Sequence, residues 1–165
     1  PRWGGSYAAM KKFAEESAPY AAKNPRIKAL AGYEDWDRGR VFEDHKDYAR
    51  AEAAYTRALG AADVAQFRFE RGDFYWRRDR YGEALKDLNR ELLQRPQDAD
   101  ALYERSNVAY YLGFHGSGPQ RASFFTQAYD DIELSVALDP INEYHQEHLA
   151  FIRKNIPAFA PPAAQ

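Results

Sequence analysis

Four histidines are the side chains of this sequence best suited to metal binding or acid–base chemistry. His145 and His148 lie three residues apart, so one face of a helix would carry both, with Glu143 and Glu147 nearby. Imidazole and carboxylate groups bind zinc, but a structural zinc site needs four ligands, and the sequence brings no others together here. We therefore predict that His148 is a packing residue and that the chain holds no metal or other cofactor.

The remaining polar groups that could support catalysis are isolated from one another. His115 and Ser117 stand in the segment HGSG, yet neither a nucleophile elbow nor an acidic partner accompanies them. Asp130 and Asp131 are adjacent on a helical segment, so they point in different directions, and we expect both to be solvated. We predict that the chain is not an enzyme.

Composition limits the class of protein and of partner. The 165 residues are 45% hydrophobic, which is enough to bury a core. The 25 acidic and 23 basic residues nearly cancel, so nucleic acid and anionic membranes are not expected partners. The absence of cysteine excludes disulfides and thiolate sites, and no stretch approaches the roughly 20 apolar residues of a membrane helix. We predict a soluble protein, cytoplasmic or periplasmic, whose natural N-terminus lies upstream of Pro1.

The elements that would position these side chains form an internal repeat. Two segments align at an offset of 33 residues and share small, aromatic and aliphatic positions: Gly39 with Gly72, Tyr48 with Tyr81, Ala51 with Ala84, and Leu59 with Leu92. A third copy begins at Ala99 and, after an interruption, matches Phe125 to Tyr81, Ala128 to Ala84, and Pro140 to Pro96. A fixed period of this length predicts a repeat architecture.

Each copy has the pattern of two helices joined by a short turn. Gly72 would allow the helices of the second copy to approach, Ala84 would lie opposite it, and Pro96 would end the pair. At these positions the chain resembles the tetratricopeptide repeat (TPR) family. That resemblance implies an all-α fold: a tetratricopeptide-type helix-turn-helix solenoid with terminal capping helices.

The predicted organisation follows from the repeat boundaries. It comprises an N-terminal capping segment and helix (1–31), three repeats (32–64, 65–98 and 99–142), a C-terminal capping helix (143–157) and a disordered tail (158–165). The third repeat carries about ten additional residues, which we predict to form a loop at 114–123 because they are rich in glycine and serine.

Some positions depart from the family pattern. The bulky apolar residue that opens the first helix is present as Leu102 but is replaced by Asp35 and Arg68 in the first two repeats, and Asp63 stands where the first repeat should have its proline. These differences predict atypical packing or a register shifted by one residue. The opening PRWGGSYAAMKKFA resembles a bacterial family of unknown function with helical repeats, and we expect Trp3 to pack on the first helix.

In a solenoid of helix pairs, the first helices build the concave wall. Projecting them inward selects a partner-binding set in which aromatic rings alternate with polar groups: Tyr33, Trp36, Arg40, Phe69, Asp73, Trp76, Arg77, Tyr103, Asn107 and Tyr110. Glu43, Asp44, Gln66, Asp100 and Tyr111 fall on the same faces. Aromatic and arginine side chains are typical anchors of protein interfaces, although we expect about half of these rings to be core.

The resemblance also sharpens the prediction of partner. Some tetratricopeptide proteins bind the C-terminal carboxylates of chaperones through lysines and asparagines, and here Asn107 alone fits that clamp. We therefore predict a module for another protein or peptide, in an adaptor, chaperone or immunity-type role, with its oligomeric state open. One alternative is the C-terminal regulatory domain of a larger protein whose activity lies upstream of residue 1. Another is an enzyme that uses the 114–123 segment.

Overall fold

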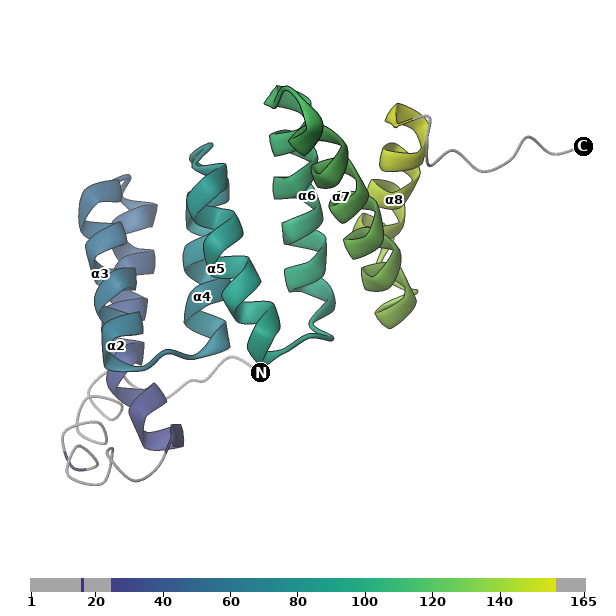
Figure 1. The fold of residues 1–165 in the computed structure, drawn as a ribbon. Coiled ribbons are helices and arrows are strands. Elements are labelled where there is room, and N and C mark those ends of the chain that lie inside the picture. Colours follow the sequence, from purple (N-terminus) through teal and green to yellow (C-terminus); the bar gives the residue numbers. More distant parts are fainter. Residues whose placement is uncertain (1–15, 17–24, 157–165) are drawn as a thin grey trace, which may run out of the picture. The chain divides into compact units, whose positions relative to one another are not determined.

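The computed structural model describes Glu16 and residues 25–156. Seven helices and no strands occupy these residues, in the order α2 (Pro25–Asp44), α3 (Tyr48–Ala61), α4 (Ala65–Trp76), α5 (Tyr81–Gln94), α6 (Ala99–His115), α7 (Pro119–Leu138) and α8 (Glu143–Asn155) (Figure 1). The predicted all-α class is confirmed. No helix in this part of the chain is long and apolar enough to span a membrane.

The chain divides into two compact units, and each is described by itself. Unit 1 extends to Arg71 and unit 2 begins at Gly72, so the boundary falls within α4. The predicted tail, the RWGGS segment and most of the N-terminal cap lie outside the described residues. Residues 25–31 belong to α2, so they continue into the first repeat and do not form a separate cap. Proline is tolerated in the first turn of a helix, where its missing N–H is not needed.

In unit 1, glycines on α2 permit close approach to α3. A Cβ atom at Gly39 would lie 2.7 Å from the ring of Tyr55, which is fully buried and donates its hydroxyl hydrogen to Glu43 at 2.9 Å. Phe67, not Arg68, fills the core against Ala58. The Arg68 side chain instead pairs with Asp63, and this register explains the atypical residues at positions 63 and 68.

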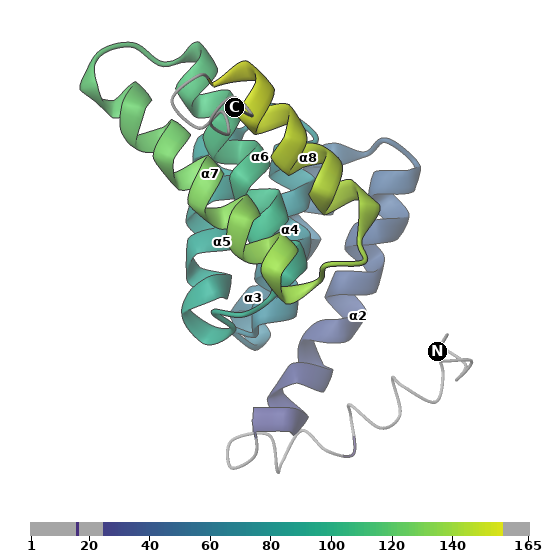
Figure 2. The same ribbon diagram turned by 90° about the vertical axis from the view of Figure 1, so that its right-hand side faces the viewer.

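In unit 2, small residues again mark the helix crossings. A Cβ atom at Gly72 would lie 3.1 Å from Leu88 and 3.6 Å from the carbonyl oxygen of Ala84, the residue expected to lie opposite. In the next pair the buried Ser106 hydroxyl donates to the carbonyl oxygen of Ala128 at 2.6 Å. Figure 2 shows α7 and α8 lying alongside α6, where a shared apolar core joins the three helices.

The predicted loop at 114–123 is wrong. Helix α6 continues to His115 and α7 begins at Pro119, so the additional residues mainly lengthen the two helices. Gly118 has a φ of +74°, which favours glycine, and Pro119 occupies the first turn of α7. Gly113 also supports the extension, because its missing side chain leaves room for the Phe125 ring.

Candidate partner-binding surface

Helices α4 and α6 carry a polar and aromatic surface within unit 2. Its α6 residues follow a helical stripe at intervals of four, three and four residues, so Asp100, Glu104, Asn107 and Tyr111 share one face. The last turn of α4 and the residue that follows it contribute the other side chains. We call the following set the α4/α6 surface: Asp73 and Trp76 from α4, Arg77 directly after α4, and Asp100, Glu104 and Tyr111 from α6.

Aromatic contacts bring the two helices together at this surface. The rings of Trp76 and Tyr111 meet edge to face with centroids 4.9 Å apart, and the ring of Tyr81 contacts both. Such contacts hold large rings in place with little rotamer freedom left to lose on binding. Trp76 is half-buried and Tyr111 is 38% exposed, so both rings offer apolar area to a ligand.

The charged part of the α4/α6 surface is dominated by carboxylates. Arg77 pairs with Asp73 at 2.7 Å, within one helical turn. Glu104 is half-buried, and its buried Oε2 atom has no hydrogen-bond partner. Burial raises the pKa of Glu104 to about 7, and the charges of Asp73 and Asp100 act in the same direction, while Arg77 opposes them. A buried carboxylate oxygen without a hydrogen-bond donor costs free energy, so this oxygen lowers the stability of the folded chain when Glu104 is ionised.

Glu104→Gln is expected to change stability in a pH-dependent way. Since its pKa is raised, folded Glu104 keeps a proton that the unfolded chain releases, and stability falls as pH rises from about 4.5 to about 7. Glutamine mimics the protonated group, so the variant should exceed the parent by on the order of 3 kcal/mol at pH 8 and by less than about 1 kcal/mol at pH 5. Urea unfolding at both pH values measures this difference. The exposed Glu147→Gln serves as the control, and a parent as stable as Glu104→Gln at pH 8 would contradict the assignment.

Other residues of the predicted set lie toward the core of unit 2. Tyr103 stacks on His145 with centroids 4.9 Å apart, and Tyr110 contacts Phe125 and Phe151. Both tyrosines pack against the buried cluster of α6, α7 and α8. The side chain of Asn107 donates to the carbonyl oxygen of Tyr103 at 3.2 Å. Tyr103 and Tyr110 therefore have packing roles, as expected for part of the aromatic set.

Unit 1 holds the remaining predicted residues. Tyr33 and Trp36 contact Phe67 with centroid distances of 5.1 and 6.5 Å, so they cover its core. The guanidinium of the exposed Arg40 lies 5.1 Å from the Trp36 ring, and the buried Nε1 atom of Trp36 has no hydrogen-bond partner. Phe69 is half-buried. The row formed by Arg40, Asp73 and Asn107 includes residues of both units and stays a prediction.

The histidines that could have formed a site have packing roles. Ser135 Oγ lies 3.0 Å from Nδ1 of the buried His145, whose Nε2 lies 3.5 Å from Asp100. Ser106 Oγ lies 3.0 Å from Nε2 of His148, and burial lowers the pKa of His148 to about 4. Within the described residues, no group of three or more histidine or acidic side chains could hold a metal ion.

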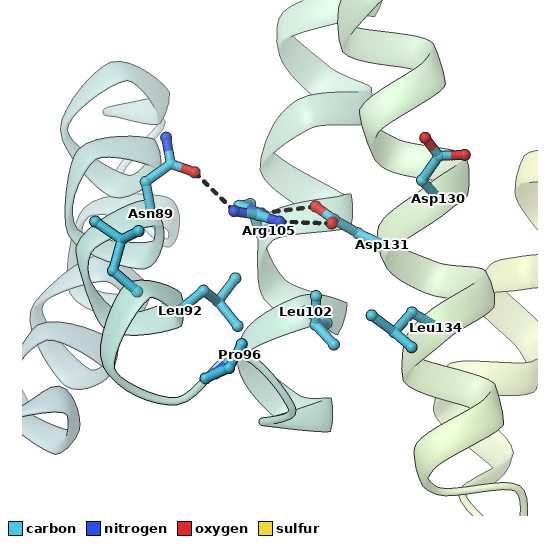
Figure 3. Close-up of a pocket in the computed structure, with 9 residues that line it drawn as sticks. Asn89, Leu92, Pro96, Leu102, Arg105, Asp130, Asp131 and Leu134 are labelled. Atoms are coloured by element: carbon cyan, nitrogen blue, oxygen red, sulfur yellow. Dashed lines mark hydrogen bonds and ion pairs between the residues drawn. The ribbon is translucent and has the colours of Figure 1, made fainter.

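A cleft in unit 2 lies between α5, α6 and α7. Figure 3 shows Arg105 at this cleft of about 250 Å³, directed toward Asp131 on one side and Asn89 on the other. The guanidinium donates to both oxygens of Asp131 at 2.7 and 2.8 Å. Asp131 is only 6% exposed, so the expectation that it is solvated is wrong, whereas Asp130 is exposed. Adjacent helical residues point in different directions, and here one of them faces α6.

Sequence reasoning missed Glu104 and the Arg105 to Asp131 pair as important residues. Glu104 follows Asp100 by four residues and precedes Tyr111 by seven, so its place on the stripe was visible in the sequence. No comparable signal marks the pairing of Arg105 with Asp131. These side chains are 26 residues apart and come together only through the packing of α6 on α7.

Comparison with known proteins gives matches among solved structures only. No protein-family model and no curated protein matches the sequence. The second TPR domain of human RPAP3, solved in complex with the HSP70 peptide SGPTIEEVD, is 26% identical, with a TM-score of 0.63 over 79% of this chain and 98% of that domain. The TPR domain of Arabidopsis OM64 is 18% identical, with a TM-score of 0.66 over 78% and 99%. The MamA RS-1 ArsTM double mutant is 17% identical, with a TM-score of 0.66 over 92% and 85%.

Proposed function

Since this chain is a tetratricopeptide repeat protein, we propose that it works by binding a segment of a partner protein, with the α4/α6 surface as its principal contact. The observation that carries the proposal is the pairing of the half-buried Trp76 ring with the exposed Tyr111 ring, on a helical face that also carries the Glu104 carboxylate. Anchored aromatic rings supply contact area, and the carboxylates of the same surface supply charge that can attract a ligand group of opposite sign.

The structural neighbours support a peptide as ligand. The RPAP3 domain is a protein of the same fold whose structure holds a bound peptide. A clamp for chaperone tails is not proposed, because the carboxylates of Asp73, Asp100 and Glu104 on this surface would repel an acidic tail. The proposal includes an adaptor, chaperone or immunity-type role and involves no catalysis.

The proposal extends to the predicted residues of unit 1. Tyr33, Trp36, Arg40 and Phe69 would offer a second contact region for the same kind of ligand. The exposed Arg40 guanidinium, which lies 5.1 Å from the Trp36 ring, supports this extension, because arginine and aromatic side chains are typical anchors of protein interfaces.

Alanine substitutions distinguish the α4/α6 surface from exposed aromatics elsewhere. Trp76→Ala and Tyr111→Ala should each weaken binding of a peptide ligand by about tenfold or more, because each removes an anchoring ring. Tyr144→Ala, which removes a ring that is 72% exposed on α8, should leave affinity unchanged. Tyr103 is a poor test residue because it stacks on His145. Isothermal titration calorimetry of the folded variants measures the change. If Trp76→Ala bound the peptide as tightly as the parent does, the α4/α6 surface would not be the binding site.

A further inference from the structure

The balance of charge at the α4/α6 surface indicates which ligand chemistry it suits. Three carboxylates meet there, those of Asp73, Asp100 and Glu104, and Arg77 is the cation whose charge reaches Glu104. Arg77 is already held against Asp73 at 2.7 Å. The surface therefore has a net negative charge when Glu104 is ionised, which would repel an acidic peptide and attract a basic one.

The burial of Glu104 adds a second, independent observation. Its Oε2 atom is out of contact with solvent and accepts no hydrogen bond. A lysine ammonium or an arginine guanidinium that lies against the half-buried Glu104 side chain would compensate the carboxylate charge, which no hydrogen bond at Oε2 offsets. Asp100, whose side chain is 72% exposed, is accessible to the same cation.

The aromatic pair sets the position of a second ligand side chain. Tyr111 follows Glu104 by seven residues on α6, which places them about 10.5 Å apart along the helix axis. An extended peptide advances about 3.3 Å per residue, so the same distance corresponds to about three residues of ligand. An apolar side chain three positions from the basic one would thus reach the Trp76 and Tyr111 rings.

We infer that the α4/α6 surface binds an extended peptide segment in which a lysine or arginine contacts Glu104 and an apolar side chain three residues away contacts Trp76 and Tyr111. This inference rests on the proposed function, since it names the ligand of the same surface. It excludes acidic tails as preferred ligands, because they would place a carboxylate beside Asp73, Asp100 and Glu104.

Synthetic peptides of 12 residues in a serine and glycine background test the inference with the full chain. One peptide carries lysine and phenylalanine three positions apart; its counterparts replace lysine by glutamine or glutamate, or place phenylalanine one position from lysine. Fluorescence anisotropy should give an affinity for the lysine peptide at least tenfold higher than for the glutamate peptide. Glu104→Gln should lower the affinity for the lysine peptide about tenfold and leave that for the glutamine peptide unchanged, while Asp130→Asn changes neither.

The outcomes separate this inference from the proposed function. The inference of a basic ligand would be overturned by any of three results: equal affinities for the lysine and glutamate peptides, no binding of any peptide, or no effect of Glu104→Gln. A partner peptide whose binding is lost in Trp76→Ala but not in Glu104→Gln would leave the proposed function standing without the inference. A folded variant is confirmed by circular dichroism, so loss of affinity cannot be ascribed to unfolding.

Discussion

Arg105→Met is expected to lower the free energy of unfolding by about 3–5 kcal/mol at pH 7, because it leaves Asp131 buried without its cation. Asn89 loses its contact with the guanidinium in the same variant. Burial already raises the pKa of Asp131 despite the opposing effect of Arg105. The penalty should therefore shrink as pH falls and Asp131 takes up a proton. Urea unfolding followed by circular dichroism at pH 7 and pH 4 measures both effects.

A neighbouring residue provides the control for this pair. Asp130→Ala removes an exposed carboxylate next to Asp131 and should change stability by less than about 0.5 kcal/mol. The double variant Arg105→Met with Asp131→Leu removes both charges and should be more stable than Arg105→Met alone. A loss below about 1 kcal/mol in Arg105→Met would show that the pair is a weak surface ion pair.

Gly32→Ala is expected to destabilise unit 1 by about 2–3 kcal/mol, whereas Gly60→Ala should stabilise it by roughly 0.5 kcal/mol. A Cβ atom at Gly32 would overlap the Phe67 ring and would lie 2.7 Å from the carbonyl oxygen of Ala58, so α2 and α3 would have to move apart. A Cβ atom at Gly60, which is exposed on α3, would meet nothing within 4 Å. The gain there comes from the lower backbone entropy of alanine in the unfolded chain.

The same urea titration measures both glycine variants. The two variants must change the free energy of unfolding in opposite directions, because both substitutions add the same methyl group to helices of one unit and differ only in the space around it. If Gly32→Ala were as stable as the parent, the close crossing of α2 and α3 would be wrong. If both variants were destabilised equally, backbone conformation and not packing would explain the losses.

The helix pairs could be predicted from the sequence because the residues that specify them lie close together in the chain and recur in each repeat. Gly72 stands at a helix crossing, and the period that aligned it with Gly39 identifies it. The 114–123 segment was mispredicted because its glycines were taken as a loop. Of its two glycines, Gly116 is the C-cap of α6 and Gly118 has the positive φ of a turn, so only a short stretch between the two helices is not helical.

The candidate surface could be predicted only in part. Helical spacing identified Asp73, Trp76 and Arg77, which share the surface with Glu104. Spacing along one helix cannot tell which rings contact a neighbouring helix, so Tyr103 appeared in the predicted set although it stacks on His145. Pairs between helices, such as Arg105 with Asp131, depend on how α6 and α7 pack and have no sequence periodicity of their own.

Selection of peptide ligands from a random 12-residue display library, against the full chain, is the measurement on which the binding proposal depends. We expect enriched peptides that bind the parent and the Tyr144→Ala control equally and bind Trp76→Ala and Tyr111→Ala at least tenfold more weakly. Failure to enrich any peptide, or enriched peptides that bind Trp76→Ala as tightly as the parent, would contradict a partner-binding role for the α4/α6 surface.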